Sequence, residues 1–192
     1  MADATVDHGF PGLSETRPAG ALAAYAAPVA SQAALRGRLT DQAFRAAAET
    51  ALGAPLPEDS RRSAVQGPLT LLRLGPDYWL ALHATDAAFA ERLEAAGAPR
   101  ALDLSSARTQ LRLDGPGARD LLSVGCQIDL RPRTFPAGAF AQTPIGNATA
   151  ILHATGDDAF AILIARSFAQ SWLGWLAHAG REFDLAIAIR PT

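Results

Sequence analysis

The chain has 192 residues, of which 49% are hydrophobic and 19% charged, and a formal net charge of −2. This balance is typical of a soluble globular protein with one substantial core, and the lack of excess positive charge argues against a nucleic-acid partner. A single cysteine, Cys126, excludes an internal disulfide and fits a reducing compartment.

Two further features of the composition concern location and partners. The first ten residues lack the basic and apolar regions of a secretory signal, and no apolar stretch approaches the ~20 residues that span a bilayer, so we expect a cytoplasmic protein. All 17 basic side chains are arginine, which forks onto carboxylates in interfaces better than lysine does. A GC-rich genome would produce the same bias.

The chain is expected to begin with an extended arm. Residues 1–34 mix alanine, glycine and proline without a clear hydrophobic period. A segment that cannot bury enough apolar area alone stays mobile or orders on a partner. Tyr25, Val29 and Leu35 would anchor this arm, and residues 35–192 are expected to form a single α+β domain.

A helix, a linker and a hairpin are predicted next. The helix spans Thr40–Leu52, with Thr40 as its cap and Gly53 at its end. The composition of residues 56–63 indicates a linker. Two β-rich runs, 69–74 and 78–83, flank a Gly-Pro-Asp turn signal and are predicted to pair as a hairpin.

The remaining elements determine the predicted fold class. Helices are expected over 86–96, from Pro116 onward, and over 167–179, the last with Phe168, Trp172 and Trp175 on one stripe; strands are expected over 108–113, 140–143, 149–153, 159–164 and 183–189. From residue 107 the order is strand, helix, strands, helix, strand. This is the split βαβ (ferredoxin-like) pattern of an α+β fold, in which helices cover one face of an antiparallel sheet.

No constellation of residues indicates catalysis. The four histidines are scattered, without the spacing of metal ligands. The turn from Gly115 to Gly117 lacks a dinucleotide fingerprint, because Asp120 stands where the third glycine belongs and Pro116 has no N–H. Cys126 is expected to be a buried small hydrophobe. The sequence therefore predicts no catalytic, cofactor-binding or metal-ligating residue.

The best functional candidates lie in a proline-bounded loop. Arg131, Arg133 and Phe135 occupy the stretch RPRTFP at 131–136, and arginine and aromatic residues are enriched in interface cores. Together with Tyr25 in the arm, they are the candidate subunit interface. A surface loop with local ion pairs, for instance to Asp129, is the alternative interpretation.

Several stretches, in order along residues ~35–185, resemble the sarcosine oxidase gamma subunit family. They are LRG at 35–37, ALGAPLP at 51–57, GPDYWL at 75–80, DLSSARTQLRLDGPGARDLL at 103–122, GCQIDLRPRTFP at 125–136, AQT at 141–143 and IARSFAQSWLGWL at 164–176. An ordered set of this kind is more specific than any single motif.

The resemblance implies a fold similar to the folate-binding region of aminomethyltransferases, and a place in a four-subunit complex. In such a complex the alpha subunit binds NAD and carries a folate domain, the beta subunit holds FAD and covalent FMN, and the delta subunit binds zinc. The complex demethylates sarcosine to glycine oxidatively and passes the methyl carbon to tetrahydrofolate. The gamma subunit is implied to hold no cofactor and to contact chiefly the flavin-binding beta subunit.

Two alternatives stay open at this point. The chain could be the small subunit of a related N-methyl amino acid oxidase or dehydrogenase that acts on N-methylglutamate or dimethylglycine. It could also be a stand-alone folate-binding protein of the aminomethyltransferase type, because DGPGARDLL at 114–122 resembles a strand–helix element of that fold.

Overall fold

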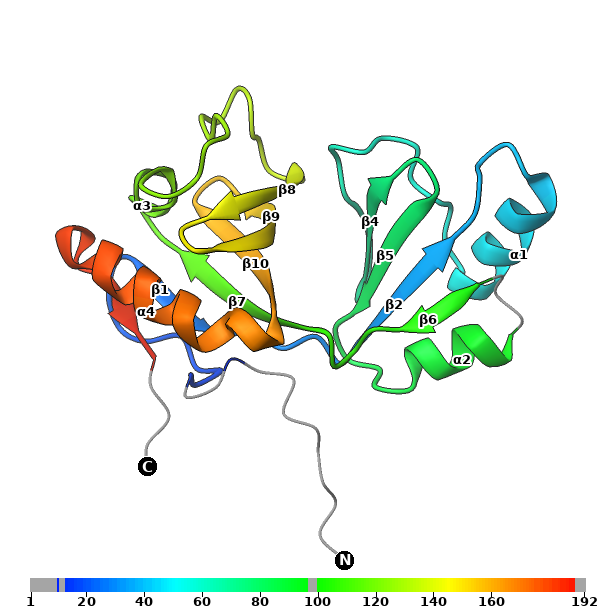
Figure 1. Ribbon diagram of the computed structural model, residues 1–192, viewed down its shortest axis with the longest axis horizontal. Helices are drawn as coiled ribbons and strands as arrows, with labels where there is room; N and C mark the ends of the chain where they lie inside the picture. The colour runs from blue at the N-terminus through cyan, green and yellow to red at the C-terminus, as the bar shows by residue number, and fades with distance from the viewer. Residues whose placement is uncertain (1–9, 11–12, 97–99, 189–192) are drawn as a thin grey trace, which may run out of the picture.

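A computed structural model describes residues 10, 13–96 and 100–188, and shows two β-sheets packed against each other with helices on their outer faces (Figure 1). The six-stranded sheet has the order β11-β1-β7-β10-β9-β8, and the five-stranded sheet has the order β3-β4-β5-β2-β6. All strand pairs are antiparallel except β1 with β11. The predicted α+β class with antiparallel sheets is confirmed.

The strands of the six-stranded sheet are β1 (Ala23–Ala26), β7 (Arg108–Asp114), β8 (Phe140–Ile145), β9 (Ala148–Gly156), β10 (Ala159–Ala165) and β11 (Ala186–Ile187). Those of the five-stranded sheet are β2 (Ser31–Arg36), β3 (Ala64–Gln66), β4 (Leu69–Gly75), β5 (Tyr78–His83) and β6 (Ala101–Asp103). The predicted hairpin is therefore confirmed as β4 and β5.

The helices are α1 (Gln42–Leu52), α2 (Phe89–Ala95), α3 (Ala118–Ser123) and α4 (Ala169–Ala179), with 3₁₀ turns η1 (Arg166–Phe168) and η2 (Gly180–Phe183). Asp41, not Thr40, caps α1, because its carboxylate accepts hydrogen bonds from the amides of Ala43 and Phe44. Gly53 ends this helix in the left-handed conformation, as predicted.

Alternation along the strands divides the interior into three apolar clusters. On β5, Trp79 packs with α1 and α2 on the outer face, whereas Leu80 and Leu82 face the other sheet. There they meet Ile151 and Leu163 of the six-stranded sheet. Since both faces of the central strands are buried, these strands read as continuous apolar runs.

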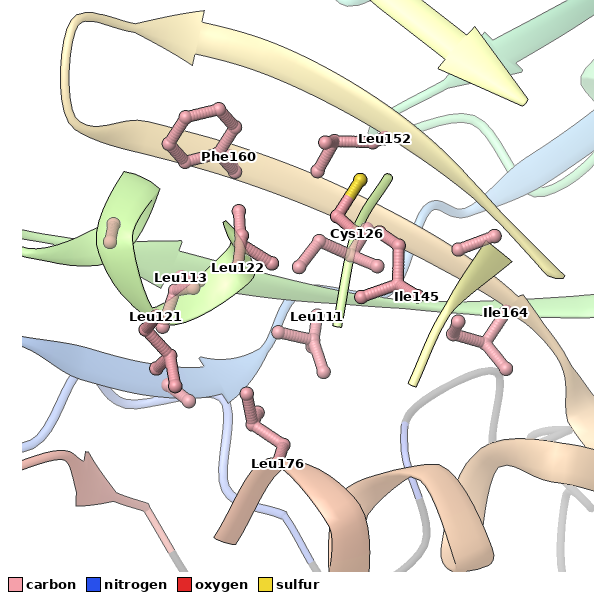
Figure 2. Packing of buried hydrophobic residues seen from close by; sticks show 14 of the residues in the cluster. Leu111, Leu113, Leu121, Leu122, Cys126, Ile145, Leu152, Phe160, Ile164 and Leu176 are labelled. Atoms are coloured by element: carbon pink, nitrogen blue, oxygen red, sulfur yellow. The ribbon is translucent and has the colours of Figure 1, made fainter. Parts of the chain in front are cut away.

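The third cluster lies between the six-stranded sheet and helices α3 and α4. Figure 2 shows Leu111 and Phe160 from the sheet meeting Leu122 and Leu176 from the two helices, with Cys126 among them. Cys126 is a buried free thiol, so its prediction as a small core residue is confirmed.

The prediction of an extended arm over residues 1–34 is wrong for residues 13–34, which the structure describes. This stretch contributes β1 to one sheet and most of β2 to the other, so the proposed boundary at residue 34 falls inside a strand. Leu13 and Leu22 are buried in the core beside α4. The local sequence lacks an alternating period because β1 and β2 are buried on both faces, between partners that lie far away in the chain.

Other predictions at the ends of elements also need correction. A strand was predicted over 183–189, but in this region only β11 is a strand. The reason is that η2 runs to Phe183 and that Asp184 takes a left-handed conformation with a φ of 49°. Ile189 lies outside the described residues. Phe168, predicted to face the core, is 51% exposed because it lies in η1, before α4 begins.

The segment predicted as a linker, residues 56–63, joins the two halves of the fold. Arg62 forms a β-bridge with Ala139, and the amide of Ser63 donates to the carbonyl of Gly138 over 2.8 Å. No helix in the described part of the chain is both long and apolar enough to cross a bilayer.

Candidate partner-binding surfaces

The loop from Asp129 to Pro136 is held in shape by its own acid. Arg131 donates to both carboxylate oxygens of Asp129, with Nε–Oδ1 at 2.8 Å, and the Thr134 hydroxyl donates to Oδ2 over 3.0 Å. These hydrogen bonds, led by those from the Arg131 side chain, hold the pKa of Asp129 well below its usual range. Arg131 therefore pairs with an acid of its own loop, which is the alternative interpretation of this loop.

A buried arginine from α3 fixes the loop from below. The Arg119 guanidinium donates to the carbonyl oxygens of Leu130 (2.5 Å) and Phe135 (2.9 Å), and its Nε donates to that of Asp157 (2.8 Å). Only 11% of the Arg119 side chain is exposed, and its guanidinium lies over the Phe160 ring. Five fork donors suit an array of converging carbonyls.

The loop divides the predicted interface residues into an inward and an outward group. Phe135 is only 6% exposed and belongs to the core that contains Trp172, so the expectation that the loop presents it is wrong. Its carbonyl accepts a hydrogen bond from Arg119, so both the backbone and the ring of Phe135 are held against the fold. Arg133 is exposed, and its guanidinium has no hydrogen bond or ion pair within the described residues.

Tyr25 is not a free anchor, because its side chain is already bonded within the six-stranded sheet. On β1 it is partly buried, and its hydroxyl donates to a carboxylate oxygen of Asp114 on the paired strand β7. Arg112 also contacts Asp114, at 3.3 Å. Burial first, and then the Asp114 carboxylate, raise the pKa of Tyr25. This side chain contributes to the sheet whether or not a partner is present.

Two motifs quoted for the resemblance meet at one rim of the five-stranded sheet. The amide of Gly37, from LRG, donates to the carbonyl of Asp77, from GPDYWL, over 3.0 Å. The Arg36 guanidinium lies 4.0 Å from the centre of the Tyr78 ring. The Phe44 ring presses on Gly37 so closely that an added Cβ would come within 2.3 Å of it. Only glycine fits at this position.

Beside this contact is a hollow of 630 Å³, which we name the arginine hollow. It is lined by Arg36, Gly37, Arg38, Asp41, Ala43, Phe44, Asp77 and Arg100. Its side chains come from the end of β2, the start of α1, the β4–β5 turn and the residue before β6. Sequence reasoning noted the two motifs but missed the hollow, because Arg100 lies more than sixty residues from Arg36.

The glycines of the predicted turn at 114–117 serve packing. A Cβ on Gly115 would lie 1.9 Å from the carbonyl oxygen of Ala21, so the start of β1 passes directly over this residue. Gly115 also has a φ of 129°, which residues other than glycine rarely adopt. The backbone contact with Ala21 therefore gives a packing reason for glycine at this turn into α3.

Within the described ranges, no group of three or more histidine, cysteine or acidic residues could hold a metal ion. His83 accepts a hydrogen bond from the amide of Asp86 at Nδ1, and His153 bonds Ser63 between the sheets. His178 is exposed near the end of α4, and His8 lies outside the described residues.

Residues 36–182 match the family described as the sarcosine oxidase gamma subunit family. Sarcosine oxidase subunit gamma from Corynebacterium sp. (strain P-1) is 35% identical over 159 residues, which cover 80% of this chain and 77% of that protein. Its counterpart from Arthrobacter sp. is 32% identical over 181 residues, covering 92% and 89%.

Solved structures give a consistent result. A chain of the heterotetrameric sarcosine oxidase from Corynebacterium sp. U-96, in complex with pyrrole 2-carboxylate, superposes with a TM-score of 0.80 at 29% identity, over 92% of this chain and 91% of that one. The glycine cleavage system aminomethyltransferase T from Bartonella henselae has a TM-score of 0.59 at 15% identity, over 88% of this chain and 48% of that one. The second likeness concerns the fold alone.

Proposed function

This chain belongs to the sarcosine oxidase gamma subunit family, and we propose that it is a non-catalytic subunit that supports assembly of a heterotetrameric sarcosine oxidase. The observation that best supports this proposal is that the chain superposes on a chain of such a complex over nearly the whole length of both. The complex would demethylate sarcosine to glycine oxidatively, linked to tetrahydrofolate, in the cytoplasm.

The polar contacts of this chain support a structural role. Arg119 donates to a carbonyl of the loop at 129–136, Asp129 accepts from Arg131 in the same loop, and the Tyr25 hydroxyl donates to Asp114 across a strand pair. Groups occupied in this way hold surfaces in shape, which supports a structural role. FAD, FMN, NAD, tetrahydrofolate and zinc would be held by the alpha, beta and delta subunits.

The proposed contact with the flavin-binding beta subunit runs through the loop at 129–136. Arg133 projects from a loop that Arg119 and Asp129 already hold in place, so little ordering would be needed on binding. Arg131 would contribute as the support that shapes the loop.

Co-purification tests this proposal directly. The chain is co-expressed with the alpha, beta and delta subunits, of which beta carries the affinity tag, and the retained material is analysed for this chain and for flavin absorbance. We expect a stoichiometric complex that oxidises sarcosine. A chain that never accompanies the flavoprotein would overturn the proposal, and preferential turnover of N-methylglutamate or dimethylglycine would assign it to a related oxidase.

The likeness to aminomethyltransferase T supports one rival, a stand-alone folate-binding protein. The chain covers about half of that protein's length, so the remainder of its fold has no counterpart here. Titrating tetrahydrofolate into the purified chain by calorimetry separates the two. Micromolar binding would favour the rival, and heats equal to dilution would dismiss it.

A further inference from the structure

The arginine hollow gathers more positive charge than it neutralises. Three guanidinium groups, from Arg36, Arg38 and Arg100, border it together with two carboxylates. One of these, Asp41, is already occupied, because its Oδ1 accepts the amides of Ala43 and Phe44 at the start of α1. Asp41 keeps its negative charge as a helix cap, so two carboxylates face three guanidinium groups and one positive charge in the hollow stays unbalanced.

The one ion pair in the hollow is loose. Arg36 and Asp77 approach only to 3.8 Å, beyond hydrogen-bond distance, and their side chains are 54% and 59% exposed. An exposed pair of this geometry contributes little to stability. Stacking on Tyr78 nevertheless holds the Arg36 guanidinium in place, so its donors are oriented but not saturated.

The other two arginines have no partner within the described residues. The guanidinium groups of Arg38 and Arg100 make no hydrogen bond or ion pair there, and both residues are exposed. Bringing three cations to one hollow costs repulsion energy in the free chain. Rim charges of this kind steer association and match an oppositely charged surface.

We propose that the arginine hollow receives an acidic segment of a partner subunit, whose Asp or Glu carboxylates pair with Arg36, Arg38 and Arg100. This inference rests on the proposed role as a subunit of a complex. A volume of 630 Å³ is in the range of sites that hold many atoms, so it admits several side chains, whereas a single inorganic anion would leave most of it empty.

The absence of lysine from the sequence makes a sharp test possible. Arg100→Lys and Arg38→Lys each keep the positive charge and add a unique side-chain amine to the full-length chain. Each variant is assembled with its partner subunits and treated with a water-soluble carbodiimide, which joins amines to carboxylates in direct contact. Peptide mass spectrometry then locates the cross-linked residues.

Arg181→Lys is the matched control, because Arg181 is an exposed arginine without a bonded partner in the described residues and lies on η2, in the other half of the fold. We expect an adduct between position 100 or 38 and an Asp or Glu of a partner subunit, and none from position 181. In the same complex, acetylation of the amine at position 100 should be at least about tenfold slower than at position 181, since packed contacts exclude water.

Two results would overturn the inference for different reasons. If the complex assembles, but positions 38 and 100 give no adduct with a partner and are acetylated as fast as position 181, the hollow is open in the complex and this inference alone fails. If no complex forms even with the unchanged chain, the proposed function fails and the inference fails with it.

Discussion

The Nε2 atom of His153, on β9, lies 2.9 Å from the hydroxyl oxygen of Ser63, in the segment that leads into β3 of the other sheet. The Ser63 hydroxyl donates its own proton to the carbonyl of Gly138, so its oxygen accepts from the imidazole N–H. His153 is buried, and burial first and the charge of Arg112 second lower its pKa from 6.5 to about 4.

This contact predicts a pH dependence of stability. Below pH 6.5 the unfolded chain takes up a proton at this histidine, whereas the folded chain does not until about pH 4. The contribution of His153 to the free energy of unfolding is therefore complete above pH 6.5 and falls by roughly 3 kcal/mol as the pH drops toward 4. Urea unfolding of the chain and of His153→Gln between pH 7 and 4 measures the difference, and parallel curves would contradict it.

Removal of the Arg119 side chain is expected to release the loop at 129–136. Arg119→Leu leaves the carbonyls of Leu130 and Phe135 without their donor in a nearly dry site, so the free energy of unfolding should fall by roughly 2–4 kcal/mol. Urea denaturation is the measurement. Arg181→Leu, which changes an exposed side chain, should alter the free energy of unfolding by less than about 0.5 kcal/mol. An equal loss in both variants would show that Arg119 does not hold the loop in place.

Arg133 and Phe135 lie two residues apart but should respond to substitution in opposite ways. Phe135→Ala empties a core site and should cost roughly 3–5 kcal/mol of folding stability. Arg133→Ala should leave the melting temperature nearly unchanged but weaken assembly by a factor of roughly 30, the size expected for an interface hot spot. Thermal unfolding and binding to the tagged flavoprotein subunit give the two readouts. Unaltered assembly of Arg133→Ala would place the contact elsewhere.

Two glycine-to-alanine substitutions should change the stability of the fold in opposite directions. Gly115→Ala drives a Cβ into the backbone of Ala21, so it should destabilise the fold by more than about 3 kcal/mol. Gly174→Ala, in the middle of α4 with open space around it, should stabilise by roughly 0.5–1 kcal/mol because alanine is the better helix former. Urea midpoints of both variants check this, and a tolerated Gly115→Ala would mean that β1 can shift.

Deletion of residues 1–30 tests whether the N-terminal part is an arm or a strand. A peripheral arm could be removed with no loss of folding, whereas the structure places β1 between β7 and β11 and buries Leu13 and Leu22 in the core. We therefore expect the truncated chain to lose cooperative thermal unfolding. A truncated chain that melts like the full-length chain would show that these residues are a peripheral arm after all.

The sequence by itself determined the elements whose signals are local. The hairpin of β4 and β5 needed only its turn and two apolar runs, and α1 needed only its apolar stripe and Gly53. The ordered motifs were likewise readable from the chain, and they led to the family.

Only the tertiary structure decided the features that depend on distant partners. β1 shows no alternating pattern because it is short and buried on both faces, and its partners, β7 and β11, lie far along the chain. Phe135 is a core residue because the loop folds back onto the cluster that contains Trp172, and Arg119 holds its carbonyl there; no local pattern encodes either contact. The arginine hollow exists because sheet pairing brings Arg100 beside Arg36, and side-chain proximity of this kind is set by strand register, which neighbouring residues do not specify.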